Sequence, residues 1–88
     1  MSNRLITFTA TGWSDYTSWQ TDDKKIIQKI NRLIEEIMRT PFAGTGKPEP
    51  LRENLAGYWS RRITDEHRLV YSADDDQICI IACRYHYK

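Results

Sequence analysis

Cysteine is scarce in this chain of 88 residues, which contains only Cys79 and Cys83. The two lie four residues apart in a strand-like run, so they would be separated by roughly 13 Å along the strand. That distance is too long for a disulfide. A zinc site would need further paired Cys or His ligands, and the chain has only two histidines. We therefore expect two small buried thiols, no metal and no cofactor.

Long apolar runs are absent as well. No stretch approaches the roughly 18 apolar residues that a membrane span requires. The N-terminus MSNRLITFTA lacks the apolar stretch and cleavage site of a signal peptide. We therefore expect a cytoplasmic protein with no membrane contact. The length predicts one small domain, residues 1–88, with a modest core.

An excess of charge of either sign is also missing, because the net charge is +1. Bulk charge therefore gives no indication of a nucleic-acid-binding protein. If the target is a polyanion, the basic side chains that bind it must be gathered locally.

The first half of the chain is predicted to form a strand and two helices. Residues 4–10 alternate and are rich in β-branched residues, which is typical of a strand. Trp13, Tyr16 and Trp19 then recur at helical spacing in a short helix for which Thr11 is a candidate cap. Such a stripe could stack on bases, but at this spacing it more often belongs to the core, and we favour the core.

The clearest element is an amphipathic helix within TDDKKIIQKINRLIEEIMRTP, residues 21–41. Its apolar residues recur every three or four positions, so they form one stripe: Ile26, Ile27, Ile30, Leu33, Ile34, Ile37 and Met38. Thr21 or Asp22 is expected to cap it, and Pro41 to end it. The following loop, residues 42–57, holds three of the four glycines and is a candidate functional segment, with a helical turn near LREN.

Three closely spaced strands are predicted after the loop, over residues 58–64, 67–73 and 77–87. Their spacing favours an antiparallel meander. The expected fold is therefore α+β, in the order β-α-α-β-β-β, with an antiparallel-rich sheet and two helices packed on one face.

Alternation along these strands indicates which side chains could stand on the open face of the sheet. It allows Arg62, Arg68 and His86 to share that face, although a bulge would reverse the parity. Arg61 is expected to face away from Arg62, where it would form a salt bridge or contact RNA. His67 is expected to be hydrogen-bonded rather than a second catalytic group.

One carboxylate in the loop has an unusual setting. Glu49 lies between two prolines in KPEP, so it is held on a stiff segment, which suits a catalytic group. Taken alone, the tetrapeptide fits a solvated glutamate in a turn better. A base, a histidine acid and several arginines without a metal are nevertheless what RNA transesterification needs. The attacking group would be a ribose 2′-hydroxyl, which makes the chemistry specific to RNA.

Several blocks of the sequence, in combination, resemble the YoeB (Txe) toxins, a branch of the RelE/ParE superfamily. They are WSDYTSW, KINRLIEEIMRTPF, GKPEPL, WSRRI, EHRLVY and CRYHY. The resemblance extends from about Trp13 to Tyr87. It implies the RelE-like fold and the toxin of a type II toxin–antitoxin pair, which cuts mRNA in the ribosomal A site and so inhibits translation.

The resemblance also implies roles for individual residues. Glu49 would be the general base, Arg68 would stabilise the transition state and His86 would be the general acid. Tyr87 would pack on a base or orient the scissile phosphate. The residues expected to bind phosphates are Lys47, Arg52 and Arg62.

The partners implied by the same resemblance are an antitoxin of the YefM (Phd) type, the ribosome with its mRNA, and a second copy of the chain. Operator DNA would be bound only through the antitoxin complex, in which the toxin acts as a co-repressor. Two alternatives stay open at this point. One is a gyrase poison like the ParE branch, because fold does not fix function. The other is a non-catalytic co-repressor that only binds its antitoxin.

Overall fold

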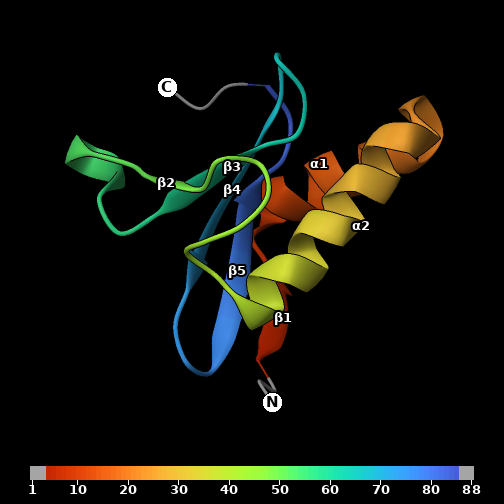
Figure 1. The fold of residues 1–88 in the computed structure, drawn as a ribbon. Coiled ribbons are helices and arrows are strands. Elements are labelled where there is room, and N and C mark those ends of the chain that lie inside the picture. The colour runs from red at the N-terminus through yellow and green to blue at the C-terminus, as the bar shows by residue number, and fades with distance from the viewer. Residues whose placement is uncertain (1–3, 86–88) are drawn as a thin grey trace.

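The computed structural model describes residues 4–85, which form a five-stranded sheet and two long helices (Figure 1). The sheet order is β1-β5-β4-β3-β2, with β1 parallel to β5 and every other neighbouring pair antiparallel. The elements, in chain order, are β1 (Leu5–Phe8), α1 (Ala10–Asp22), α2 (Lys24–Arg39), β2 (Glu49–Pro50), the 3-10 turn η1 (Glu53–Leu55), β3 (Trp59–Arg62), β4 (Arg68–Ala73) and β5 (Gln77–Ala82). The predicted α+β order is confirmed, with the short β2 as an addition.

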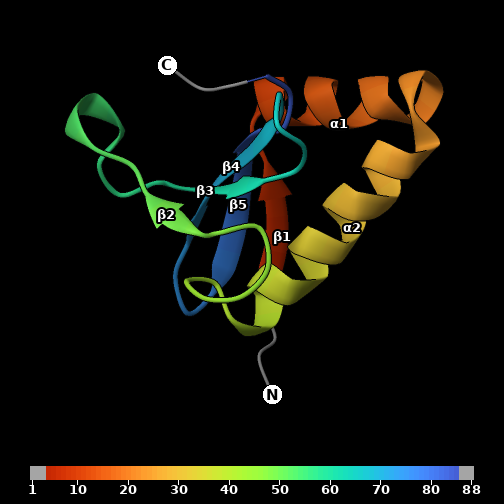
Figure 2. The same cartoon turned by 45° about the horizontal axis from the view of Figure 1, so that its top comes forward.

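Both helices lie on the same side of the sheet, as predicted, and meet in a V (Figure 2). The apolar stripe of α2 faces the sheet, because a side chain every third or fourth residue falls on one side of a helix. The buried core joins this stripe to the inward side chains of β4 and β5. Its central members are Ile30, Leu33, Ile37, Leu69, Tyr71, Ile78 and Ile80.

The caps of both helices differ from those predicted. Thr9, not Thr11, caps α1, and its hydroxyl accepts from the amide of Gly12. Asp23, not Thr21 or Asp22, caps α2. The reason is that α1 continues through Asp22, so the first residue with extended backbone, which a capping residue requires, is Asp23.

Gly12 is needed where α1 approaches β5. A Cβ there would overlap the carbonyl of Ile80, so only glycine allows this separation. The aromatic stripe on α1 is only partly core. Trp19 is buried and Tyr16 half-buried, but Trp13 is 54% exposed.

β5 is shorter than predicted and contains a bulge. Val70 pairs with Ala82 while Tyr71 pairs with Ile80, so Ile81 has no partner on β4. The bulge reverses the alternation of side chains beyond it. As a result Cys79 lies opposite Ser72 on the outer face, whereas Cys83 is fully buried in the core. Both are free thiols, and burial is the main cause that raises the pKa of Cys83 to about 12.

Within residues 4–85, no helix is both long and apolar enough to cross a bilayer.

Candidate functional site

A small cleft of about 150 Å³ opens on the face of the sheet away from the helices. It is lined by Gly46, Lys47, Glu49, Ser60, Arg62 and Arg68. Four of these are residues that the sequence singled out as a base, as a transition-state stabiliser or as phosphate ligands. The structure therefore brings together one carboxylate and three cationic side chains from the loop before β2, from β2, β3 and β4.

The strand register explains why these residues meet. Glu49 pairs with Ser60, and Arg62 pairs with Arg68. Arg61 and Ile63, which flank Arg62, are buried toward the helices. Because alternate side chains point to opposite faces, Ser60 and Arg62 must stand on the open face. Arg62 and Arg68 therefore share one face, as the alternation allowed.

Glu49 owes its place to the two-residue strand β2. The amide of Arg62 donates to the carbonyl of Gly46 at 2.7 Å, and the amide of Leu51 donates to the carbonyl of Tyr58 at 2.8 Å. These bonds tie both ends of the KPEP segment to the β3 region. Gly46 has a φ of +85°, and a Cβ there would press on the backbone of Arg62. The glycine is what allows the loop to lie this close to β3.

Arg68 is oriented by the turn that precedes β4. Its Nη1 donates to the carbonyl of Thr64 at 2.6 Å and to that of Asp65 at 3.2 Å. Its backbone amide donates to the carbonyl of Tyr85 at 3.1 Å. The guanidinium of Arg68 is therefore bound to the turn at residues 64–65, and its backbone amide is bound to Tyr85, the last described residue.

The segment between α2 and Lys47 is held in place by Arg61, which has no exposed surface. Its guanidinium pairs with Glu36 at 2.5 Å. It also donates to the carbonyls of Thr40, Ala43 and Thr45 and to the hydroxyl of Tyr71. Of the two roles expected for Arg61, the salt bridge is the one observed. The residue is unavailable to RNA.

Two pKa values reflect this network. Hydrogen bonds from the backbone and hydroxyl of Thr45, together with Arg61, hold the pKa of the Glu36 carboxyl below its usual value. Burial is the main cause that raises the pKa of the Tyr71 hydroxyl, which donates to the carbonyl of Pro41 at 2.6 Å. Glu36 is thus a stable anion that orders the segment leading to Lys47 and Glu49.

Three of the predicted site residues are not among those lining the cleft. Arg52 is exposed beside η1 and outside the cleft. His86 and Tyr87 lie outside the described residues. Sequence reasoning also missed Gly46 and Ser60 as lining residues. Period-two alternation did place Ser60 beside Arg62, and that signal would have sufficed to include it.

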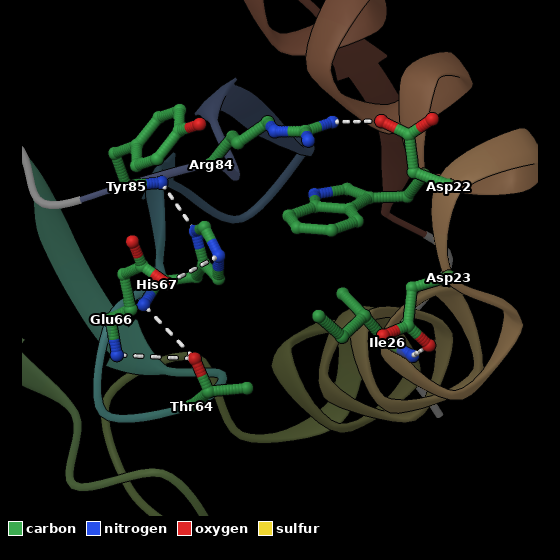
Figure 3. A pocket seen from close by; sticks show the side chains of 9 residues that line it. Asp22, Asp23, Ile26, Thr64, Glu66, His67, Arg84 and Tyr85 are labelled. Atoms are coloured by element: carbon green, nitrogen blue, oxygen red, sulfur yellow. Dashed lines mark hydrogen bonds and ion pairs between the residues drawn. The ribbon is translucent and has the colours of Figure 1, made fainter.

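A larger cavity of about 600 Å³ lies elsewhere, at the end of α1 (Figure 3). Its walls include the carboxylates of Asp22, Asp23 and Glu66. Arg84 is paired there with Asp22 at 2.8 Å. Because carboxylates repel phosphate, this cavity suits an RNA backbone less well than the smaller cleft does. Size therefore does not identify the better anion site.

His67 lines this second cavity and is hydrogen-bonded, as expected. It is 7% exposed, and its Nδ1 accepts from the backbone amide of Tyr85 at 2.7 Å. Figure 3 shows the imidazole between Tyr85 and the turn that contains Thr64.

The topology and the lining residues define a small α+β domain with a basic cleft on the open face of its sheet. Comparison with known proteins identifies the family. A model of the YoeB-like toxins of bacterial type II toxin–antitoxin systems matches residues 8–87. The toxin YoeB of Escherichia coli K12 is 64% identical over 75 residues, which are 85% of this chain and 89% of that protein.

Solved structures agree. The YoeB dimer from Staphylococcus aureus superimposes with a TM-score of 0.90 at 49% identity, covering 98% of this chain and 100% of that one. The YoeB–YefM complex from the same organism gives 0.87 at 48% identity, with the same coverage. The chain belongs to the YoeB family of type II toxins.

Proposed function

We propose that this protein is a metal-independent endoribonuclease that cuts mRNA on the ribosome. The observation that carries the proposal is the cleft, in which Glu49 lies with Lys47, Arg62 and Arg68 on the open face. A single exposed carboxylate surrounded by cations suits proton abstraction beside a phosphate. Membership of the YoeB family supports the same function.

The proposed reaction is an internal transesterification. Glu49 accepts the proton of the ribose 2′-hydroxyl, and the 2′-oxygen forms a bond to the adjacent phosphorus. Arg68, with Lys47 and Arg62, stabilises the charge that develops on the phosphorane. The bond to the 5′-oxygen breaks, and His86 donates a proton to that oxygen. The products are a 2′,3′-cyclic phosphate and a 5′-hydroxyl, and no oxidant or metal is needed.

We propose three further partners beyond the RNA. A YoeB–YefM complex is known from Staphylococcus aureus, so an antitoxin of the YefM type is the expected inhibitor, with co-repression through the complex. The ribosomal A site would present the mRNA. A second copy of the chain is the third partner, because a YoeB dimer is known from the same organism.

The experiment is primer extension on mRNA with purified translating ribosomes and the wild-type protein. Glu49→Gln and His86→Gln should each abolish the cut, while the control Glu53→Gln should cut like the wild type. Glu53 is an exposed carboxylate of the same loop but outside the cleft. Undiminished cleavage by both Glu49→Gln and His86→Gln would overturn the assignment. Loss of gyrase supercoiling without RNA cleavage would instead support the ParE-like alternative.

A truncation tests the acid separately. Deleting residues 86–88 keeps every buried core residue of the described range 4–85, so we expect the fold to persist while cleavage is lost. Cleavage by the truncated protein would place the acid elsewhere.

A further inference from the structure

The chain leaves the sheet at Ala82 but remains tied down. The amide of Cys83 donates to Oδ2 of Asp15 at 3.0 Å, and its carbonyl accepts from Nε1 of Trp19 at 2.9 Å. Arg84 stacks 4.0 Å above the ring of Trp19 and pairs with Asp22. Side chains of α1 thus replace the lost strand partners on one side of this segment.

The next residue, Tyr85, is held from the opposite side by the start of β4. Its amide donates to Nδ1 of His67 at 2.7 Å, and its carbonyl accepts from the amide of Arg68 at 3.1 Å. The backbone amide and carbonyl of Tyr85 are therefore both held, by the consecutive residues His67 and Arg68. Figure 3 shows the bond from Tyr85 to the His67 ring.

Tyr85 also has an uncommon backbone conformation. Its φ is +63°, in the left-handed region that residues other than glycine rarely adopt. Its side chain is 56% exposed, so burial of the ring does little to stabilise this conformation. A strained backbone conformation persists only where the surrounding structure holds it in place. The two backbone hydrogen bonds of Tyr85 hold this conformation.

We propose that His67 is a positioning residue for the catalytic acid: its Nδ1 holds the amide of Tyr85 and thereby fixes the backbone of the residue that precedes His86 in the sequence. This inference rests on the proposed function. His67 does not touch the reacting atoms in this scheme. It acts through Tyr85, the residue that immediately precedes the acid.

The environment of His67 suits such a role. The ring lies edge-on to Trp19, with centroids 4.8 Å apart, and is buried between α1 and β4. Because Nδ1 is an acceptor, the neutral ring carries its proton on Nε2. That nitrogen lies 3.5 Å from Oε1 of Glu66. Packing against Trp19 therefore fixes the plane of the ring. The hydrogen bond from Tyr85 requires the tautomer that is protonated on Nε2.

A matched pair of variants separates the hydrogen bond from the packing. His67→Phe keeps a ring against Trp19 but has no acceptor, whereas His67→Asn restores an acceptor near the position of Nδ1 but removes the ring. Since a displacement of about 1 Å can cost a hundredfold in rate, we expect His67→Phe to lower kcat by about 10- to 100-fold with little change in KM. We expect His67→Asn to recover most of this loss.

The second measurement does not depend on activity. Hydrogen exchange of the Tyr85 amide in the full-length protein should be roughly tenfold faster or more in His67→Phe than in the wild type or His67→Asn. Glu53→Gln is the control and should change neither kcat nor exchange, because Glu53 is exposed and lies outside both the cleft and the cavity that His67 lines.

Three results would overturn the proposal. They are an unchanged kcat in His67→Phe, an unchanged Tyr85 exchange rate in His67→Phe, or equal losses of kcat in both variants that follow their losses of stability. If the wild type cleaved no RNA, the proposed function would fail. The exchange rates would still decide whether His67 holds this segment.

Discussion

Arg61 shows how a charged side chain can organise a loop from inside the protein. It reaches Glu36, three backbone carbonyls of residues 40–45 and Tyr71 from a position with no solvent exposure. A buried charge costs free energy unless its hydrogen bonds are satisfied, and here the loop supplies the acceptors. The loop carrying Lys47 and Glu49 is therefore coupled to the core through one guanidinium.

Replacing Arg61 should consequently destabilise the fold. We expect Arg61→Met to lower the free energy of unfolding by about 3–5 kcal/mol, because it removes the positive partner of Glu36 and leaves the loop carbonyls without their donor. Urea denaturation followed by tryptophan fluorescence measures this change. The neighbouring variant Arg62→Met is the control, since Arg62 is exposed in the cleft and should cost less than about 0.5 kcal/mol. Equal losses in the two variants would contradict the role of Arg61.

Glu36 makes the same network sensitive to acid. Its pKa is lowered in the folded protein, first by the Thr45 amide and also by the Thr45 hydroxyl and Arg61. The ionised form therefore stabilises the fold above the unfolded pKa, and this contribution is lost as the pH falls through the folded pKa.

The urea midpoint of the wild type should fall as the pH drops below the ordinary pKa of a glutamate carboxyl. In Glu36→Gln it should be lower at neutral pH and should fall less steeply with acid. Glu35→Gln, which changes an exposed carboxylate on the same helix, provides the charge-matched control. A Glu36→Gln profile parallel to that of the wild type would exclude this contribution.

At the scale of elements, Asp23 joins the two helices. Its amide donates to the carbonyl of Trp19 and so ends α1, while its Oδ1 accepts from the amides of Lys25 and Ile26 and so begins α2. One residue with extended backbone thus serves both helices and sets the V between them.

Loss of this cap should be measurable. We expect Asp23→Ala to lower the free energy of unfolding by about 1 kcal/mol, and Asp23→Asn to preserve most of it, because asparagine is an equally good cap. Thr21→Ala should cost no more than a few tenths of a kcal/mol, since Thr21 lies inside α1. Thermal unfolding of the three variants would show whether Asp23 or Thr21 caps α2. A larger loss of stability in Thr21→Ala than in Asp23→Ala would favour Thr21.

The elements that sequence predicted best are those with strong periodicity. The stripe on α2 fixed its length and its buried face, since seven apolar residues at helical spacing leave little alternative. The end of β5 was not predictable. The bulge at Ile81 depends on the register with β4, and nothing in QICIIACRYHY records that pairing. Arg84 lies beyond the end of β5 and contacts Trp19 and Asp22 of α1.

The candidate site likewise has a part that the sequence predicted and a part that it did not. Alternation along β3 and β4 placed Arg62 and Arg68 on one face, and the prolines of KPEP singled out Glu49. The meeting of Glu49 with the arginines required β2, which is too short to leave a periodic signal. The contact of His67 was invisible because its partner is a backbone amide, and every residue except proline carries one.

At the scale of the whole molecule, charge is separated rather than abundant. The net charge is +1, yet the cleft collects Lys47, Arg62 and Arg68, while the cavity beside α1 collects Asp22, Asp23 and Glu66. Local arrangement can therefore provide an anion site that the total charge does not suggest.

RNA binding should reflect this small number of cations. For single-stranded RNA each neutralised phosphate contributes about −0.7 to the slope of log K against log salt, so three cleft residues predict a slope near −2. Binding of a non-cleavable oligonucleotide to Glu49→Gln, measured at several salt concentrations, tests this value. Adding Lys47→Gln should reduce the slope by about 0.7, and adding Lys24→Gln, on α2, should leave it unchanged. A slope that Lys47→Gln does not alter would place the phosphates elsewhere.

The pairing of β1 with β5 has a consequence for how the protein folds during its synthesis. Leu5–Phe8 pairs with a strand that lies about 70 residues later in the chain, so the closure of the sheet is a long-range step. During synthesis β1 must wait until nearly the whole chain has been made. Contacts of such separation slow folding and come late. A protein built this way completes its sheet only after β5 has been synthesised.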